Sequence, residues 1–408
     1  MSTVAEVAAE RSRPAPASGQ DLSILHLTPH DELCGIAKYQ ERSLRALADR
    51  PGLRNTVFRW SPYQTRDMDR RAFTAVLAEL RAALVDHDIL HLQHEFELYP
   101  ADQFAQIARV VLTAKKRLVV TVHTSPGTRY RPLKLNKLGP RSLITLARDH
   151  RERRRFMRQH GRAFRMADAL IVHNPSIADG LRRLGAAPSR IHLLPHPVPT
   201  VSHDRVSTAI RDRLGARPGD TVVAMVGFIH RSKGIQDAIQ ALSLLPSTYK
   251  LAIIGGMHPL SHDHGFLDEL TDLVSRLDLA HRVCITGSVE DDKAMNALIR
   301  ECDVCVFPYD RVYYAQASSD SLSLALANHV PVIAYPTDAF VAVGRATDAL
   351  ILCTDFSSEA LARELLKVDL STQRERAATY ASAMSWSARA MDLANLLLTL
   401  APGVSART

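Results

Sequence analysis

Residues 221–234 read Thr-Val-Val-Ala-Met-Val-Gly-Phe-Ile-His-Arg-Ser-Lys-Gly, a valine-rich run that stops at a glycine. Such a run predicts a strand, and the residues from Ile235 onward follow a helical period. A glycine at the end of a strand lets the backbone approach a ligand, and Arg231 and Lys233 add two cations. The stretch predicts a strand, turn and helix that suit a diphosphate at Gly227. A turn with solvated basic residues is the alternative.

Apolar runs of the same kind recur on both sides of this stretch and alternate with segments of helical period. The alternation is typical of parallel strands joined by crossover helices. The strands that it predicts cover 22–27, 56–60, 89–93, 118–123, 169–173 and 191–194, then 221–226, 250–255, 282–286, 304–307, 332–335 and 350–353. We therefore expect an α/β fold of two doubly wound, Rossmann-like domains facing a central cleft, where a ligand binds.

The domain boundaries follow from breaks in this pattern. The proline-punctuated stretch 195–199 predicts a linker, so the domains are expected over 21–199 and 200–384. Residues 1–20 resemble a disordered tail in composition. Residues 385–402 carry a broad apolar stripe and predict a helix that returns to the first domain.

Composition limits the class of protein. The chain has 408 residues, a net charge of +8 and five cysteines without regular spacing, so we expect a cytoplasmic protein with reduced thiols. Cys302 and Cys305 lack the second ligand pair that zinc needs, and we expect no metal. Neither GxGxxG after a first strand nor GxxxxGK[ST] occurs, which argues against a dinucleotide oxidoreductase and a P-loop ATPase.

A second candidate anion site precedes the predicted helix 322–328. The residues before it read Gln316-Ala-Ser-Ser-Asp-Ser321. Free amides and the positive end of a helix dipole attract anions, and the hydroxyls of Ser318, Ser319 and Ser321 can add donors. The same serines could simply be N-caps, and Asp320 would repel a phosphate that it faced.

Six motifs, in order along nearly the whole chain, resemble the family-4 retaining glycosyltransferases of the GT-B fold. They are Cys34-Gly-Ile-Ala-Lys-Tyr39, Thr121-Val-His123, Gly227 to Gly234, Asp303 to Pro308, Gln316 to Pro331 and Ser385-Trp386. The resemblance implies a nucleotide-sugar donor bound mainly by the second domain and an acceptor held by the first. It also implies transfer with retention, without metal or other cofactor, in which a donor phosphate oxygen takes the acceptor proton.

The resemblance also assigns residues to the site. Gly35 matches a glycine loop that lies against the donor phosphates, and His123 matches a histidine near the donor sugar. Lys233 and Arg231 would contact the diphosphate, and Gln316 would contact the sugar. From the sequence alone, His123 could instead be a strand-end histidine bonded to a loop carbonyl.

The chain departs from the family pattern at two places. Gln316 and Leu324 stand where the family has two glutamates, and Phe228 replaces an arginine. An amide can still bond sugar hydroxyls, but leucine cannot bind the ribose. Some branches of the family share a CGIA-type opening and Gln-x-Ser-Ser, which favours an active enzyme. A silent nucleotide-sugar-binding or scaffold protein is the alternative.

Positive charge is concentrated between residues 129 and 165, where 13 basic residues stand against two acids. Six arginines step by three and four along one predicted helix face, namely Arg148, Arg151, Arg155, Arg158, Arg162 and Arg165. Such a face suits an anionic membrane surface that carries a lipid-linked acceptor, with the protein peripheral on the inner face of the membrane. A merely solvated face and a nucleic-acid-binding face are the alternatives, and no nucleic-acid module supports the latter.

Overall fold

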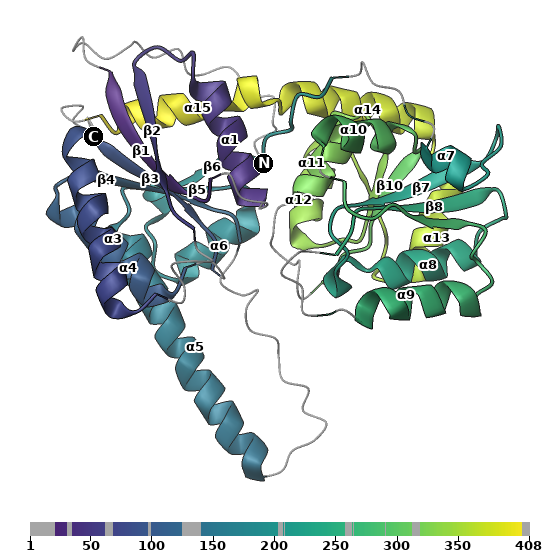
Figure 1. The fold of residues 1–408 in the computed structure, drawn as a ribbon, viewed down its shortest axis with the longest axis horizontal. Helices are drawn as coiled ribbons and strands as arrows, with labels where there is room; N and C mark the ends of the chain where they lie inside the picture. Colours follow the sequence, from purple (N-terminus) through teal and green to yellow (C-terminus); the bar gives the residue numbers. More distant parts are fainter. Residues whose placement is uncertain are drawn as a thin grey trace. The chain divides into compact units, whose positions relative to one another are not determined.

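The protein was analysed as a computed structural model (Figure 1). The structure describes residues 21–30, 35–61, 68–96, 99–124, 140–202, 207, 209–257, 263, 265–289, 291–311 and 319–401. The expected tail at 1–20 lies outside these residues. The chain forms two compact units: one contains the described residues up to His196 and from Trp386 onward, and the other contains those from Pro197 to Ser385.

The first unit is built on a six-stranded parallel sheet of order β2-β1-β3-β4-β5-β6. Its strands are β1 (Leu22–Thr28), β2 (Leu53–Arg59), β3 (Ile89–His94), β4 (Arg117–Val122), β5 (Ala169–Val172) and β6 (Ile191–Leu193). Side chains alternate between the two faces, so Leu25 and Leu27 join one buried cluster while Leu22 and Ile24 join another. Both faces are covered, as a parallel sheet requires.

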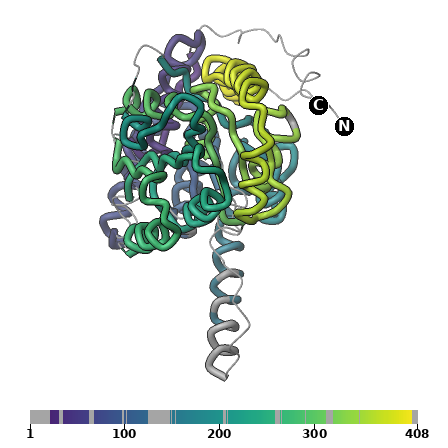
Figure 2. Tube along the Cα trace, turned by 90° about the vertical axis from the view of Figure 1, so that its right-hand side faces the viewer, coloured from purple at the N-terminus to yellow at the C-terminus, as the bar shows by residue number. Residues whose placement is uncertain are grey.

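Six α-helices of the first unit surround this sheet in the described residues. They are α1 (Gly35–Leu47), α3 (Arg70–Ala83), α4 (Ala101–Thr113), α5 (Pro140–Met166), α6 (Pro175–Arg183) and α15 (Trp386–Thr399), with 3₁₀ turns η1 (Leu84–Asp86) and η2 (Pro188–Arg190). The C-terminal turns of α5 bury Phe156, Ala163 and Phe164 in the core. Towards its N-terminus the helix extends well beyond the sheet (Figure 2).

The second unit repeats the architecture with the order β12-β11-β10-β7-β8-β9, again all parallel. The strands are β7 (Thr221–Val226), β8 (Tyr249–Ile254), β9 (Val283–Ile285), β10 (Val304–Phe307), β11 (Val332–Ala334) and β12 (Ile351–Leu352). All twelve predicted strands are present, with shifts of a few residues at their ends. The prediction of two doubly wound α/β domains is confirmed. The cleft between them stays a prediction.

Helices flank the second sheet on both faces. They are α7 (Ala209–Arg213), α8 (Ile235–Ser243), α9 (Gly265–Arg276), α10 (Asp292–Arg300), α11 (Asp320–Ala327), α12 (Asp338–Thr347), α13 (Ser358–Lys367) and α14 (Leu370–Ala383), with the 3₁₀ turn η3 (Arg231–Lys233). Two buried clusters cover the faces: Val222 and Ala224 of β7 contribute to one, and Val223 and Met225 to the other.

The last helix, α15, packs on the sheet of the first unit although it follows the second unit in sequence. Its residues Ala390, Leu393, Ala394 and Leu397 join the cluster that contains Ile24. Arg50 donates a hydrogen bond to the backbone oxygen of Ser387 at 2.9 Å. The terminal helix therefore forms part of the first unit, as the apolar stripe in the sequence predicts.

Candidate active site

The strand order of the second unit marks where a ligand would bind. The chain leaves β7 towards β8 on one side and returns through β10 on the other, so β7 and β10 flank the topological switch point. Open α/β sheets bind ligands at the carboxyl ends of the strands at this point. The turn after β7 and the loop after β10 are in direct contact there, because a Cβ on Gly234 would lie 1.8 Å from the Pro308 oxygen.

Three residues predicted from the sequence meet at this edge. Gly227 follows β7 with φ +101°, Lys233 lies in the turn after it, and Ser321 lies in the first turn of α11. A Cβ on Gly227 would lie 2.5 Å from both the Lys233 Nζ and the Ser321 Oγ. A side chain at this position would displace both groups, and the left-handed φ also favours glycine. The sequence places these residues up to 94 positions apart, and the fold brings them together.

Lys233 is the cation of this group. Its side chain is buried, and its Nζ donates to the Val226 oxygen at 3.3 Å and to the Ser321 Oγ at 3.5 Å. Both hydrogen bonds are long, and charged donors form shorter and stronger bonds with anionic oxygens. The Nζ also lies 5.7 Å from the centre of the Tyr309 ring. A buried ammonium group beside a strand-end glycine and a serine hydroxyl suits an anionic ligand.

The first turn of α11 supplies a helix N-terminus at the same edge. Ser319 is the N-cap, and its Oγ accepts from the Leu322 amide at 3.2 Å. The same Oγ lies 3.3 Å from the Tyr309 hydroxyl, and burial raises the pKa of that hydroxyl to about 12. Ser319 is thus an N-cap, the alternative weighed above, while Ser321 contacts Lys233. Ser318 and Gln316 lie outside the described residues.

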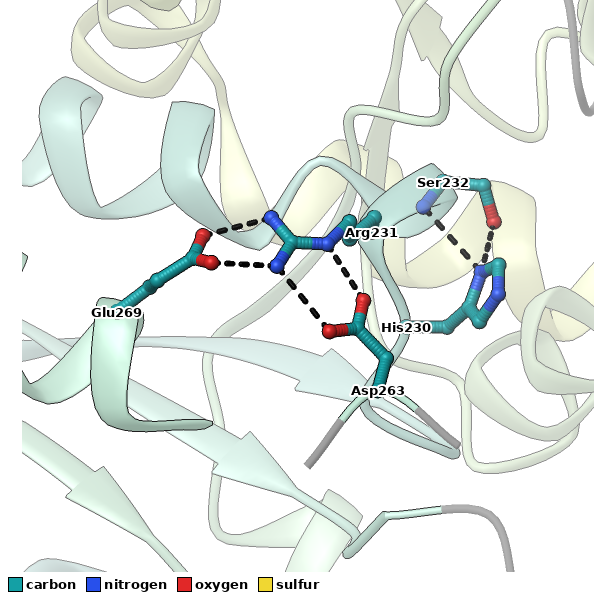
Figure 3. Close-up of polar contacts among 5 residues, drawn as sticks. All are labelled: His230, Arg231, Ser232, Asp263 and Glu269. Carbon is teal, nitrogen blue, oxygen red and sulfur yellow. Dashed lines mark hydrogen bonds and ion pairs between the residues drawn. The ribbon is translucent and has the colours of Figure 1, made fainter. Parts of the chain in front are cut away.

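Arg231, which the sequence predicts to lie at the diphosphate, does not contact Gly227, Lys233 or Ser321 through any hydrogen bond in the described part of the chain. Its guanidinium group lies between two carboxylates and bonds both: Asp263 at 2.5 and 3.2 Å, and Glu269 of α9 at 2.6 and 2.5 Å (Figure 3). It also lies 4.5 Å from the Phe266 ring centre. The pairing lowers the pKa of Glu269. Arg231 therefore fastens the turn to α9, since bidentate pairing satisfies its donors.

His123 and Gly35 belong to the first unit. Gly35 begins α1, is exposed and has no atom within 4 Å of an added Cβ. His123 follows β4, is half-buried, and its Nε2 lies 2.8 Å from the Gln93 Oε1. Its side-chain partner is therefore an amide of β3 and not the loop carbonyl considered above. Burial, followed by His173 and His196, holds the pKa of His123 well below its usual range.

Two features around His123 were missed in the sequence. Tyr39 of α1 lies at the centre of a ring cluster, with centroid distances of 4.8 to 5.3 Å to His123, His173, His196 and Trp386. Behind Gln93 a network of polar side chains runs into the sheet. The sequence does carry a pattern that could have indicated this network. In β3, His91 and Gln93 alternate with leucines inside a buried strand.

Leu324 occupies the position at which the family has its ribose-binding glutamate. In the structure it is partly buried on α11 and packs against the apolar cluster of the second unit. It contributes to the core of that unit. Leu324, which departs from the family pattern in the sequence, therefore has a packing role in the structure.

One arginine of the predicted α5 face has a partner on another helix. All six arginines are exposed, but the Arg165 Nη1 also donates to the backbone oxygen of Leu184 at 3.0 Å, at the end of α6. A cation there satisfies a helix C-terminus. Arg148 pairs with Glu152 at 3.0 Å. Arg154, also exposed, lines a concavity of about 460 Å³ with His150, Met157 and Arg158.

The described residues contain neither a cluster of metal ligands nor a membrane-spanning helix. No group of three or more His, Cys, Asp or Glu side chains there could hold a metal ion. Within the same residues, every helix is too short or too polar to cross a bilayer.

Comparisons with known proteins cover both units. Residues 28–201 match the family model described as Glycosyltransferase Family 4, and residues 206–384 match the model of glycosyl transferases group 1. A D-inositol 3-phosphate glycosyltransferase from Xylanimonas cellulosilytica is 30% identical over 150 residues, 35% of each chain. The match therefore spans about a third of that relative.

Solved structures share the fold at low identity. HepE from Anabaena, solved with UDP, superimposes with a TM-score of 0.69 at 15% identity, over 92% of this chain and 99% of that one. A sucrose-phosphate synthase from Thermosynechococcus elongatus gives a TM-score of 0.69 at 18% identity, over 93% and 99%. With family models matching both units, the chain belongs to the group 1, family-4 glycosyltransferases and has the GT-B fold that its motifs predict.

Proposed function

We propose that the protein transfers a sugar, of hexose type, from a nucleoside diphosphate donor to a hydroxyl acceptor with retention at the anomeric carbon. The observation that carries this is the group formed by Gly227, Lys233 and Ser321 at the switch point of the second unit. Solved structures of the same fold were determined with UDP and with UDP-glucose, which supports a nucleotide-sugar donor. The acceptor class proposed is a growing cell-surface polysaccharide or glycolipid.

The leaving diphosphate needs positive charge that is already in place. Lys233 supplies a buried ammonium group, and the N-terminus of α11 supplies the positive end of a helix dipole. Charged donors and a helix N-terminus form strong hydrogen bonds with the oxygens of a departing diphosphate. This set of donors suits leaving-group stabilisation without a metal.

Donor binding is the first test. We expect at least one member of a panel of UDP-, GDP- and ADP-sugars to raise the melting temperature by several degrees, since saturation at 100 times Kd adds about 2.7 kcal/mol. Differential scanning fluorimetry would measure this, with the free sugars as controls. Absence of a shift with every donor and every free nucleotide would refute the proposal.

The alternative is a silent binding protein, motivated by Gln316 and Leu324 in place of the acidic pair. It predicts the same thermal shift without chemistry. Release of free nucleotide from the bound donor, followed by chromatography with and without candidate acceptors, separates the two. Catalysed release excludes the silent protein.

The exposed part of α5 extends the proposal to the site of action. We propose that Arg148, Arg151, Arg155, Arg158 and Arg162 bind an anionic membrane surface, where a lipid-linked acceptor would be held. These side chains are exposed, and α5 extends beyond the sheet towards its N-terminus (Figure 1). Each basic residue near an anionic leaflet contributes about 1 kcal/mol. The protein would then be peripheral on the inner membrane face.

Reversing three of these charges should release the protein from membranes. The variant R151E/R155E/R158E is expected to bind phosphatidylglycerol vesicles at least about 100-fold more weakly in co-sedimentation, because three attractive charges become repulsive. The control R70E/R71E/R81E changes the same charge on exposed positions of α3 and should bind as the parent does. Equal losses in both variants, or equal binding to neutral vesicles, would contradict a role for α5. A gel shift with duplex DNA tests the nucleic-acid alternative.

A further inference from the structure

A continuous hydrogen-bonded network of polar side chains runs from His123 into the sheet of the first unit. We call it the His123 network; its members are His123, Gln93, Gln40, His91, Thr121, His26 and Asn55. Five of them, Gln40, Gln93, His91, His26 and Thr121, are at most 1% exposed. Buried polar groups at this density are costly unless they are mutually satisfied. Their arrangement therefore needs an explanation beyond packing.

The end next to His123 is centred on Gln93 of β3. Its Oε1 lies 2.8 Å from the His123 Nε2. Its Nε2 donates to the Gln40 Oε1 at 2.6 Å and lies 3.3 Å from the His91 Nε2. The oxygen and both N–H groups of the Gln93 amide thus have partners, which fixes the orientation of the side chain.

The far end of the network is centred on His26 of β1. The Gln40 Nε2 lies 2.9 Å and the His91 Nδ1 3.1 Å from the His26 Nδ1. The His26 Nε2 lies 2.9 Å from the Asn55 Oδ1. His91 also lies 2.8 Å from the Thr121 hydroxyl through its Nε2. Adjacent strands place these groups, since His26 pairs with His91 in the sheet.

The orientation of the amides sets the direction of the hydrogen bonds that they make. The Gln93 oxygen faces His123, so the His123 Nε2 must be the donor. The Gln93 NH₂ group then donates to Gln40 and His91, the Gln40 NH₂ group donates to His26, and the second nitrogen of His26 donates to Asn55. All these bonds point away from His123. Reversing one amide would require the others to reverse with it, so the assignment is cooperative.

We propose that Gln93 is a positioning residue that holds His123 in the Nε2–H tautomer, which leaves Nδ1 as an acceptor for a hydroxyl of the donor sugar. The part of this inference that concerns the sugar rests on the proposed function. The tautomer itself does not. A histidine whose second nitrogen is fixed by a side chain presents one defined group to its ligand.

The ring environment agrees with a neutral histidine. Burial, followed by the charges that His173 and His196 would carry, lowers the pKa of His123. The Tyr39 ring packs edge-on against it at 4.8 Å. In the neutral Nε2–H form the Nδ1 can accept a hydrogen bond but cannot donate one. The site would therefore favour a sugar hydroxyl at this position over a carboxylate, which only accepts.

The tautomer can be read directly by NMR. In protein with ¹⁵N-labelled histidine, long-range ¹H–¹⁵N spectra distinguish the Nε2–H from the Nδ1–H form, and His123→Asn identifies the signal. We expect the Nε2–H form in the parent protein. Gln93→Leu should give a mixture of tautomers, because the acceptor is gone. A parent protein in the Nδ1–H form would overturn the proposal without any variant.

Turnover provides the second readout. Gln93→Leu is expected to lower kcat for the accepted donor by about 10- to 100-fold, with a smaller change in KM, because His123 is misplaced and not removed. The control is Gln103→Leu, which replaces a buried glutamine of α4 outside the network. If Gln93→Leu changes neither the tautomer nor kcat, or if Gln103→Leu lowers kcat equally, the positioning role is wrong. A protein that shows the Nε2–H tautomer but turns over no donor would refute the proposed function and leave the tautomer assignment standing.

Discussion

A Leu397→Ala variant is expected to lower the free energy of unfolding of the first unit by about 2 to 5 kcal/mol. Leu397 is on the last helix, α15, and its side chain is fully buried. It belongs to a cluster with Leu22, Ile24 and Val119 of the sheet. Truncation of the side chain to alanine removes apolar contacts between the helix and the sheet. It leaves a cavity between α15 and a face of the parallel sheet that must be covered.

The chain offers a specific probe and a matched control for this prediction. Its only two tryptophans, Trp60 and Trp386, both belong to the first unit, so tryptophan fluorescence in a urea titration follows that unit alone. Met391 lies on the same helix and is 51% exposed, so Met391→Ala should change stability by less than about 0.5 kcal/mol. Equal stability of Leu397→Ala and the parent protein would mean that α15 does not support the sheet.

The fold could be predicted because its strands are buried on both faces. A strand such as β10 (Val304–Phe307) is a short apolar run, and its boundaries were predicted without error. The edge strand β2 was placed too late, starting at residue 56 instead of Leu53, because its first residues, Leu-Arg-Asn, include polar side chains. An edge strand alternates between buried and exposed positions and therefore lacks a continuous apolar run.

The candidate site could be predicted only where the backbone fixes it. Gly227 and Lys233 follow β7 directly, so their position follows from the strand and the turn. Arg231 lies in the same turn, yet its direction is set by Asp263 and Glu269, which stand 32 and 38 residues later. No periodicity in the sequence links these three residues. Two cations in one turn can therefore have different surroundings, one paired with carboxylates and one at the candidate site. Only the tertiary structure distinguishes them.

The His123 network shows a different limit. Its members come from α1 and from strands β1, β2, β3 and β4, and they meet because β1 pairs with β3 as well as with β2. Sequence patterns indicate that His91 and Gln93 are polar residues in a buried strand. They do not give the strand order, which decides which polar residues face one another. The partner of each buried amide thus depends on topology.

A Lys233→Ala variant is expected to weaken binding of the donor, or of its free nucleoside diphosphate, by about 10- to 150-fold. This corresponds to roughly 1.5 to 3 kcal/mol for a hydrogen bond to a charged group. The ammonium group is buried between Gly227 and Ser321, and its present bonds to Val226 and Ser321 are 3.3 and 3.5 Å long. Isothermal titration calorimetry with the nucleotide found in the donor panel would measure the loss.

Arg231→Ala is the matched control, because it removes the same charge from the same turn. Its guanidinium group is bonded to Asp263 and Glu269, so we expect the thermal stability to fall while the nucleotide affinity changes by less than about threefold. Equal losses of affinity would mean that the turn attracts the diphosphate only through its net charge. That effect would also disappear as salt is raised to about 1 M, where the Debye length is about 3 Å, whereas a direct bond to Lys233 would persist. A Lys233→Ala variant with unchanged affinity at low salt would place the diphosphate away from the β7 turn.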